Sequence, residues 1–556
     1  MSVTTRGLNR SLKSDRPMAM AGTLALAIST AMLNQVHAAE QVTLDTMVVE
    51  DNGVAADANP YAQPDSPYKA KKVSDQRQTR DIADTPHTMT VMTKEAIEES
   101  GKTELKDLLS AQPGITLGTG EGGNSFGDRY IIRGYEARSD VFTDGLREPG
   151  LITRETFALE QVEISKGPNS SFAGRGSTGG AVNTVTKKAS LDDEFTTVQS
   201  GFGTAKHKRF TLDTNQVLAD DTAVRFNALY TDADIPNRAP AAEQRQGFLL
   251  SGVHQATDDL KVSADIYHFR GDDRTDAGIA FDTTTGAFNK YGYVGQDGLD
   301  FQETAADIFT VTADYHINDA MKLQNKTRYG ETKNDYIVSI YSARSAGLRS
   351  FTGWQDNTYL GNQTNLIIDQ NILGKRHTIV AGIEYAKEGV EAGNYTVTTS
   401  NSFTLDPYNP DNSLWEGSVA KNDASSDLTI KTVSAYLMDT VTLNDDWEVF
   451  GGVRYDYFDY SLWKAAYTDR SGNLIPEADY AFSDGFWNGH LGVVFSPWEH
   501  GNVYASWSTS SNINGGEADA GTNCGYGGLC MDSNGNYLSA EPEQSTNYEI
   551  DRKSVV

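Results

Sequence analysis

The 556-residue sequence has few long apolar runs and is poor in basic residues. Its mean hydropathy of −0.48 excludes a membrane protein built from many spanning helices. The same value is compatible with a membrane β-barrel, because such barrels have a polar lumen and long loops. Acidic residues outnumber basic ones by 76 to 47, and the resulting net charge of −29 argues against binding to nucleic acid. We expect most of this charge on a solvated acidic surface.

Cysteine is also scarce. The only two, Cys524 and Cys530, flank the glycine-rich segment Gly-Tyr-Gly-Gly-Leu. Two cysteines alone do not complete a structural zinc site, which takes four ligands. If the protein is exported, we expect the pair to close a small disulfide loop.

Sequence motifs of the common enzyme classes are absent. The chain contains no G-x-x-x-x-G-K-[ST], no H-E-x-x-H and no G-x-S-x-G. Its nine histidines are scattered along the sequence, which does not favour a metal site held by the protein. We therefore expect no enzyme, and no metal or cofactor bound by the protein itself.

The most informative stretch runs from residue 160 to residue 187. It predicts a strand over Val162 to Ser165, a turn at Gly167-Pro168, a glycine-rich bend and a second strand over Ala181 to Thr186. The glycines at 174, 176 and 179 spell G-x-G-x-x-G, but a dinucleotide site needs a helix directly after them. Here an alternating, β-branched segment follows. We expect the glycines to let one strand turn closely past another.

Two further short strands end in glycine turns, Tyr130-Ile-Ile-Arg-Gly-Tyr135 and Val141-Phe-Thr-Asp-Gly-Leu146. The motifs I-R-G, D-G, V-E-x-x-K-G-P and G-x-x-G-G-x-[VI]-N-x-[VI]-[TS]-K occur in this order. Together they resemble the plug domain of TonB-dependent outer-membrane receptors, especially the ferric catecholate siderophore receptor group. The resemblance covers about residues 73–188. The residues that match the structural motifs of the plug are Arg133, Gly134, Asp144, Gly145, Lys166, Gly167, Pro168, Gly179 and Gly180.

The first 38 residues resemble a secretory signal peptide. A basic start precedes an apolar core from Met18 to Leu33, and Val36-His37-Ala38 is an acceptable cleavage site. A membrane anchor is the alternative, but sixteen residues rich in alanine, serine and threonine are short for a span. We expect export through the Sec route to the outer membrane of a Gram-negative cell.

Residues 39–72 are predicted to form a flexible leader. Leu44 to Glu50 is an isolated β-prone run, and residues 51–72 have the proline-containing composition of a linker. The resemblance implies that this run holds the TonB box, which the energy-coupling partner grips by strand addition. The alternative is an apolar run without a role. The residues assigned to the box are Asp45, Thr46, Met47, Val48 and Val49.

The predicted plug domain, residues 73–188, opens with a strand at Thr90 to Thr93. A helical stretch follows from Lys94 to Leu109, and Gln112-Pro113-Gly114 ends it.

After residue 188 the pattern changes to alternating strands joined by connections of two lengths. Long connections are expected at about 271–304, 331–361, 390–430, 460–485 and 508–545. Short turns on one side and long loops on the other are typical of an outer-membrane barrel. A soluble β-sandwich also alternates, but does not explain these two lengths. The short turns are Ala219-Asp-Asp, Thr257-Asp-Asp, Asn318-Asp-Ala, Leu373-Gly-Lys, Asn444-Asp-Asp and Pro497-Trp-Glu-His-Gly501.

These turns predict 13 barrel strands, and Gln544 to Asp551 would begin a fourteenth. The resembling family has 22, and an open barrel would leave unpaired strand edges in lipid. We expect that part of the barrel is missing from the C-terminal end of this sequence. The predicted fold is mainly β: an antiparallel outer-membrane β-barrel over residues 189–556, with an N-terminal α+β plug inside its lumen.

Candidate ligand contacts lie near the expected outer end of the plug. Ferric catecholates are anionic and aromatic, so guanidinium groups and aromatic faces suit them. The leading candidates are Arg138 and Arg147. An alternative is that interleaved carboxylates pair with every arginine, and that the aromatic residues are ordinary loop packing. Arg133 is expected to bridge plug and barrel wall. The full set of candidate contacts is Arg129, Arg138, Arg147, Arg154, Trp354 and Tyr359, with Trp415 as a further loop aromatic.

The resemblance implies an energy-coupled receptor that imports an iron–siderophore complex. The iron would stay within the siderophore. The expected partners are the ferric siderophore, TonB with its inner-membrane energising complex, and outer-membrane lipid; a monomer is expected. A haem or cobalamin receptor is the alternative, although the haem group's N-P-N-L motif is absent before Glu541. A passive porin is less favoured, because a plug would fill the open lumen that a porin needs.

Overall fold

A computed structural model describes residues 56–63, 65–118, 127–138, 140–148, 150, 152–279, 285–342, 347–406, 408–468, 472–498, 501–513 and 541–554. The chain divides into two units, residues 1–53 and 54–556, and every described residue belongs to the second. The expected signal peptide, the expected TonB box and the pair Cys524 and Cys530 lie outside the described residues.

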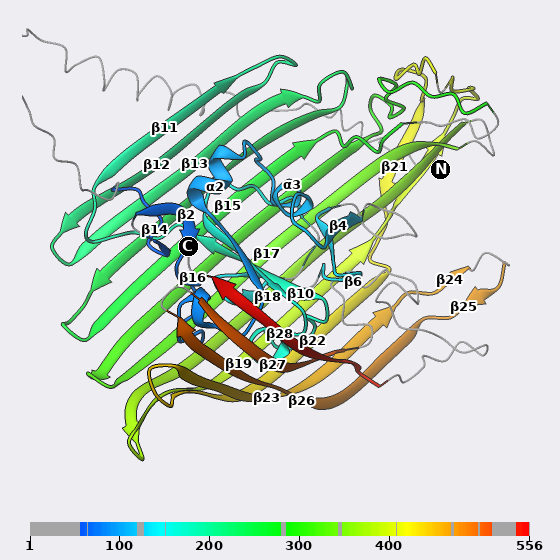
Figure 1. Ribbon diagram of the computed structural model, residues 1–556. Coiled ribbons are helices and arrows are strands. Elements are labelled where there is room, and N and C mark those ends of the chain that lie inside the picture. Colours follow the sequence, from blue (N-terminus) through cyan, green and yellow to red (C-terminus); the bar gives the residue numbers. More distant parts are fainter. Residues whose placement is uncertain are drawn as a thin grey trace, which may run out of the picture. The chain divides into compact units, whose positions relative to one another are not determined.

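A single sheet of 14 antiparallel strands dominates the described chain, and we call it the barrel sheet. It curves around the smaller N-terminal elements (Figure 1). All six short turns predicted from the sequence join neighbouring strands, and the fourteenth strand is present. The strands, in spatial order, are β11 (Phe195–Phe202), β12 (Lys208–Ala219), β13 (Thr222–Asp234), β14 (Ala242–Gln255), β15 (Leu260–Asp273), β16 (Phe301–Asn318), β17 (Met321–Ser342), β18 (Gly347–Ile372), β19 (Lys375–Gly393), β22 (Ser426–Thr442), β23 (Trp447–Lys464), β26 (Ala478–Trp498), β27 (Gly501–Asn512) and β28 (Glu543–Ser554).

The predicted long connection over 331–361 is wrong. Strands β17 and β18 continue through it and stay in register until Ser342 pairs with Gly347. The strand pattern is hidden because both faces are polar at 331–335 and 355–358, whereas both faces are largely apolar at 336–341. Two other connections contain small hairpins of their own, β20 (Tyr395–Thr399) with β21 (Gly417–Lys421), and β24 (Tyr467–Thr468) with β25 (Leu474–Ile475).

The two faces of the barrel sheet differ in chemistry. On β22, Ser434 and Tyr436 are buried, whereas Val433 and Leu437 on either side of them are exposed. The same alternation leaves apolar side chains exposed along the sheet, up to 82% for Ile550. An apolar outward face opposite a polar inward face is the pattern of a barrel wall that meets lipid.

The N-terminal plug is a small α+β domain. Its main sheet has the order β3 (Met89–Thr93), β9 (Leu159–Lys166), β10 (Gly180–Thr186), β7 (Val141–Thr143) and β8 (Leu146–Arg147), with β10 parallel to β7. A second sheet contains β4 (Ile115–Gly118), β5 (Arg129–Ile132) and β6 (Tyr135–Glu136). Both sheets share one core in which Leu105, Leu109, Val162, Ile164 and Val182 are fully buried.

The helical part of the plug differs from the prediction. The single stretch from Lys94 to Leu109 is divided into α2 (Lys94–Glu99) and α3 (Leu105–Ser110). Gly101, with φ of +66°, ends the first helix. Two shorter helical turns, η1 (Ile82–Asp84) and α4 (Ser170–Ala173), were not predicted. Within the expected linker, β1 (Ala62–Gln63) and β2 (Ser66–Ala70) form a hairpin.

The plug motifs are turns and close approaches. Arg133-Gly134 joins β5 to β6, and Asp144-Gly145 joins β7 to β8, with φ of +51°, +86°, +50° and +81° respectively. Positive φ at both central residues is the geometry of a tight type I′ hairpin turn. At Gly179, an added methyl group would collide with the carbonyl oxygen of Ile132. The glycine-rich bend therefore does let strands pass closely, as the sequence predicted.

Among the described residues, no helix is both long enough and apolar enough to cross a membrane.

Candidate functional site

The candidate site is the interface where charged side chains of the plug meet the barrel sheet. On one side of the plug, basic residues face carboxylates of β19 and β23. Arg80 Nε lies 2.8 Å from Glu448 Oε1, Arg147 Nε lies 3.9 Å from Glu388 Oε1, and Arg175 donates to Glu388. These residues are buried or half-buried, so their attraction is screened less than that of a surface pair.

On another side of the plug, the charges are reversed. The plug carboxylate of Glu155 accepts from Arg209 of β12 at 2.8 Å, and Glu104 accepts from Arg245 of β14 at 2.7 Å. Glu160 likewise accepts from Arg225 of β13 at 3.0 Å. The plug is thus attached to the sheet by ion pairs of both polarities.

Asp144, in the tight turn after β7, is a highly connected carboxylate of the plug. It accepts hydrogen bonds from the backbone N and the Oγ1 of Thr186, both at 2.9 Å, and from Lys188 Nζ and Arg328 Nη2, both at 3.0 Å. Burial opposes its ionisation, but the charges of Lys188, Arg328 and Lys326 hold the pKa of Asp144 well below its usual range. The D-G motif is therefore both a turn and an anchor to β17.

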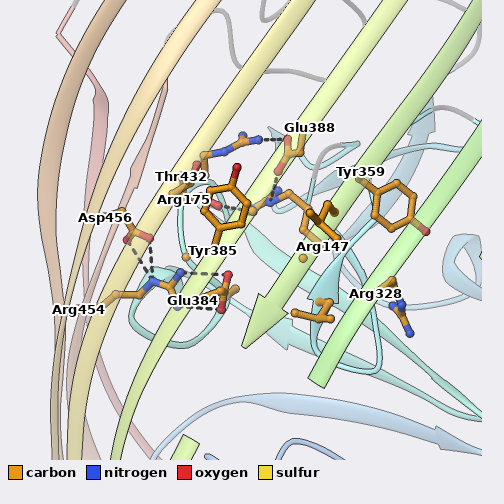
Figure 2. Close-up of a pocket in the computed structure, with 16 residues that line it drawn as sticks. Arg147, Arg175, Arg328, Tyr359, Glu384, Tyr385, Glu388, Thr432, Arg454 and Asp456 are labelled. Atoms are coloured by element: carbon orange, nitrogen blue, oxygen red, sulfur yellow. Dashed lines mark hydrogen bonds and ion pairs between the residues drawn. The ribbon is translucent and has the colours of Figure 1, made fainter. Parts of the chain in front are cut away.

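A cavity lies between this part of the plug and strands β17 to β23 (Figure 2). Arg147 and Arg175 enter it from the plug, and Arg454 enters it from β23. Arg454 lies 3.3 Å from Glu384 and 2.9 Å from Asp456. The guanidinium groups of Arg147, Arg175 and Arg454 point toward carboxylates in this view, so this cavity is an ion-paired joint between plug and wall.

Two of the four predicted ligand arginines are paired within the plug. Arg129 lies 2.6 Å from Glu136, and Arg154 lies 3.1 Å from Glu148. Both arginines and both of these glutamates are buried or half-buried. This arrangement matches the alternative in which interleaved carboxylates neutralise the arginines.

The two leading candidates are also interior residues. Arg138 is 0% exposed, and Arg147 lies 3.3 Å from Asp140 and donates to the carbonyl oxygen of Arg175. The sequence placed both arginines at loop tips that face outside, and this placement is corrected by their burial. Their role in ligand binding stays a prediction.

Two of the three predicted loop aromatics are wall residues. Trp354 and Tyr359 both lie on β18 and are 6% and 3% exposed. Trp354 Nε1 donates to the carbonyl oxygen of Asn422 at 3.1 Å, and Tyr359 lines the cavity of Figure 2. Trp415 donates to Thr399 Oγ1 at 3.2 Å beside the β20–β21 hairpin.

Arg133 was expected to bridge the plug to the barrel wall. It occupies the turn after β5, and its Nη1 lies 3.1 Å from the position that a methyl group on Gly167 would take. Asn547 of β28 lies 3.7 Å from that same position. Burial and the charge of Arg133 lower the pKa of Lys166. Arg133 thus lies beside the V-E-x-x-K-G-P motif where it meets the wall, and the bridging role stays a prediction.

An aromatic cluster was missed by the sequence analysis. Phe458 and Tyr460 of β23 pack against Phe482 and Phe486 of β26, with ring centroids 5.0–5.9 Å apart. Phe486 pairs in register with the fully buried Asp456, so the cluster faces the inner side of the sheet. The alternation Phe-x-Tyr-x-Leu at 458–462 was its sequence signal, but residues 460–485 had been taken as a loop.

We compared the sequence with models of protein families. The barrel model described as "TonB dependent receptor-like, beta-barrel" matches residues 247–551. The model described as "TonB-dependent Receptor Plug Domain" matches residues 81–181. The two matches fall on the barrel sheet and on the plug.

Curated relatives agree with this assignment. The chain is 32% identical over 479 residues to the probable TonB-dependent receptor BfrD of Bordetella pertussis, covering 80% of this chain and 64% of BfrD. It is 28% identical over 574 residues to the catecholate siderophore receptor Fiu of Escherichia coli strain K12, covering 95% and 73%. The chain thus spans less than two thirds of BfrD and about three quarters of Fiu.

Solved structures give the same fold. The siderophore receptor PiuA from Acinetobacter baumannii superimposes with a TM-score of 0.79 at 26% identity, over 87% of this chain and 72% of that one. The closed form of the ferric-catecholate import receptor Fiu gives a TM-score of 0.79 at 27% identity, over 88% and 73%. With a plug against the inner face of an antiparallel sheet and both family models matched, the chain belongs to the TonB-dependent receptor family.

Proposed function

We propose that this protein is an energy-coupled outer-membrane receptor that binds a ferric siderophore of the catecholate type and imports it to the periplasm. One observation carries the proposal: a folded plug is tied to the inner face of the barrel sheet by ion pairs on several strands. A passive pore needs an open lumen. Relatives described as a catecholate siderophore receptor and a siderophore receptor support the ligand class.

The aromatic cluster of Phe458, Tyr460, Phe482 and Phe486 is the ligand contact that we favour. It lies toward the ends of β23 and β26 that lead into the long connection, on the plug-facing side. Catechol rings stack on aromatic faces, and such pairs contribute about 0.5–1.5 kcal/mol each beyond their buried area. In this proposal the iron stays within its chelate, and the protein supplies binding rather than catalysis.

Energy for import would come from TonB and its inner-membrane complex, acting on the box at residues 45–49. A pulled strand transmits force to the plug through the segment that follows it. Asp57 is held by Lys94 and Thr197, and Gln76 by Lys322. Thr79 to Thr88 is held to the wall by hydrogen bonds to Thr440, Asn502 and Lys553, so the pull would reach Asp57 first and this segment later. Export by the Sec route and a monomer in outer-membrane lipid complete the proposal.

Fluorescence titration of the purified full-length protein tests the ligand class. A ferric catecholate should quench tryptophan fluorescence with micromolar or tighter affinity, and haemin and cyanocobalamin should not compete. Tyr460→Ala with Phe482→Ala should weaken catecholate binding by about tenfold, since two lost ring contacts of about 0.5–1.5 kcal/mol each give that factor. Tyr548→Ala is the matched control, because Tyr548 is 80% exposed on the sheet. Tight binding of haemin with no response to the catecholate would overturn the assignment.

A further inference from the structure

The plug presents positive charge to one part of the barrel sheet and negative charge to another. Toward β19 and β23 its ion pairs are made by its own bases, Arg80, Arg147 and Arg175, on the wall carboxylates of Glu388 and Glu448. Arg77 follows the same pattern, 4.0 Å from Glu384. We call Glu384, Glu388 and Glu448 the glutamate wall.

Toward β12, β13, β14 and β17, the plug contributes acids instead. Its carboxylates at Glu104, Asp144, Glu155 and Glu160 pair with wall guanidinium groups at 2.7–3.1 Å. The exceptions are Lys187 and Lys188, which pair with Asp213 and Asp265 where the chain leaves the plug for β11. We call the guanidinium-bearing surface the arginine wall: Arg209, Arg225, Arg245 and Arg328.

This polarity decides what is uncovered when the plug moves away from the sheet. Movement at the glutamate wall leaves three glutamates beside one wall base, Arg454, which is itself paired with Glu384 and Asp456. Movement at the arginine wall leaves four guanidinium groups, of which those of Arg225 and Arg245 also pair with the wall acids Asp213 and Asp273. In a confined, poorly screened channel, negative wall charges repel an anion and positive wall charges concentrate it. Guanidinium groups also match the oxygens of an anionic chelate with paired N–H donors.

A cavity borders each wall: the one in Figure 2 lies at the glutamate wall, and a second lies beside the arginine wall. This second cavity separates the plug from β14 to β17 and is lined by Ile152 and Arg154 of the plug and by Leu249, Tyr267 and Arg328 of the wall. Tyr267 stacks with Phe157 of the plug at a centroid distance of 6.1 Å. An aromatic ring and a guanidinium group therefore border a gap between plug and wall.

We propose that the anionic chelate crosses the lumen along the arginine wall and not along the glutamate wall. The inference rests on the proposed function, since it takes an anionic iron chelate as the cargo. It assigns Arg209, Arg225, Arg245 and Arg328 a second role: they hold the plug acids at rest and guide the cargo when those acids move away.

Two matched double variants test the route. Arg209→Gln with Arg225→Gln removes two charges from the arginine wall, and Glu388→Gln with Glu448→Gln removes two from the glutamate wall. Both doubles remove ion-pair partners from the plug, so a purely structural effect would slow uptake in both. The readouts are the initial rate of radiolabelled ferric catecholate uptake in iron-starved cells, and binding at 0 °C, where transport stops.

We expect the arginine-wall double to slow uptake by about tenfold with unchanged binding, by analogy with steering by surface charge. Arg209→Lys with Arg225→Lys should restore most of the rate, because it keeps both charges. The glutamate-wall double should import at the wild-type rate or faster. Equal slowing of both doubles, or slowing of the glutamate-wall double alone, would overturn the inference.

Leakage of a large antibiotic reports whether each plug is still seated. If the arginine-wall double leaks, the single variants Arg209→Gln and Glu448→Gln replace the doubles. Each of these loses one 2.8 Å ion pair, at side chains that are 14% and 20% exposed. Uptake by the wild-type protein separates the proposed function from the proposed route. No uptake by wild type contradicts the proposed function, whereas normal uptake by wild type and by all variants contradicts only the route.

Discussion

The guanidinium of Arg328, on barrel strand β17, lies 3.0 Å from the carboxylate of Asp144, which occupies the tight turn between β7 and β8 of the plug. Arg328 also donates to Thr310 Oγ1 at 2.9 Å. The pair is buried on both sides, with side-chain exposures of 2% and 7%. A turn motif of the plug is in this way tied directly to the wall.

The first prediction follows from this pair. Asp144→Asn should lower the free energy of unfolding by about 3–5 kcal/mol, because it leaves the buried guanidinium of Arg328 without its carboxylate. Thermal unfolding of the purified protein in detergent measures the loss. Asp192→Asn, at an exposed position, is the control and should change stability by no more than about 0.5 kcal/mol. Equal stability of the two variants would show that Asp144 is not an anchor.

The second prediction concerns the glycine-rich bend. Gly179→Ala should destabilise the plug by roughly 1–3 kcal/mol, because its new methyl group would meet the backbone oxygen of Ile132, which cannot move aside cheaply. Gly252→Ala, where the nearest atom is 4.0 Å away, should be tolerated. Protease resistance of the plug in outer-membrane preparations reports the difference. A Gly179→Ala plug as resistant as wild type would contradict the close approach.

The third prediction is a pH dependence at Asp128. Burial raises the pKa of this carboxyl from its usual 3.8 to about 6, against the opposing charges of Lys106 and Arg154. Because the pKa is higher in the folded state, the folded protein binds more protons than the unfolded protein at pH values between these two pKa values. The contribution of Asp128 to stability therefore falls as pH rises from about 4 to about 6, and stays low above that window.

Asp128→Asn should consequently raise the unfolding free energy at pH 7.5 by about 1–3 kcal/mol and flatten its change between about pH 4 and pH 6. The amide oxygen can still accept from Tyr130 Oη and the backbone N of Arg154, which lie 2.9 and 3.0 Å from Asp128 Oδ2. Asp107→Asn on α3 serves as the control. A stability profile that keeps its slope in Asp128→Asn would assign the slope to another group.

The fourth prediction separates the two roles considered for Arg138 and Arg147. Their burial leads us to expect that replacing both by Gln loosens the plug and increases antibiotic leakage, with little change in the dissociation constant of a ferric catecholate. A direct ligand role requires the reverse, a loss of binding of at least about tenfold in a plug that stays sealed. Measuring leakage and binding on the same preparation decides between them.

Much of the fold was predictable because strand alternation and turn chemistry are local. Leu373-Gly374 has φ of +52° and +78° and joins β18 to β19 as its residues indicated. Asp144-Gly145 was likewise recognisable as a turn. By contrast, β17 and β18 run past Ser339 and Ser350, whose hydroxyl oxygens lie 3.0 Å apart across the strands. Polar residues on both faces at 331–335, and apolar residues on both faces around Ser339, removed the alternation that identifies a strand.

The site was less predictable, because it depends on which distant residues meet. Glu155 of the plug lies 2.8 Å from Arg209, 54 positions later in the chain, and spacing gives no sign of such a pair. The arginines at 129, 147 and 154 were visible in the sequence, but whether they faced a ligand or a carboxylate depended on tertiary packing. The aromatic cluster became apparent only once Tyr460 and Phe482 were seen to pair in register.

The central claim is import that is driven by coupling at the leader and gated by the plug. Its most direct test is uptake of radiolabelled ferric catecholate by iron-starved cells that express either the wild type or Val48→Pro from the full-length gene. Proline removes a backbone N–H that strand pairing with TonB needs. We predict that both proteins bind the chelate equally at the cell surface and that only the wild type accumulates iron. Equal accumulation by both, or none above background with the wild type, would contradict the account.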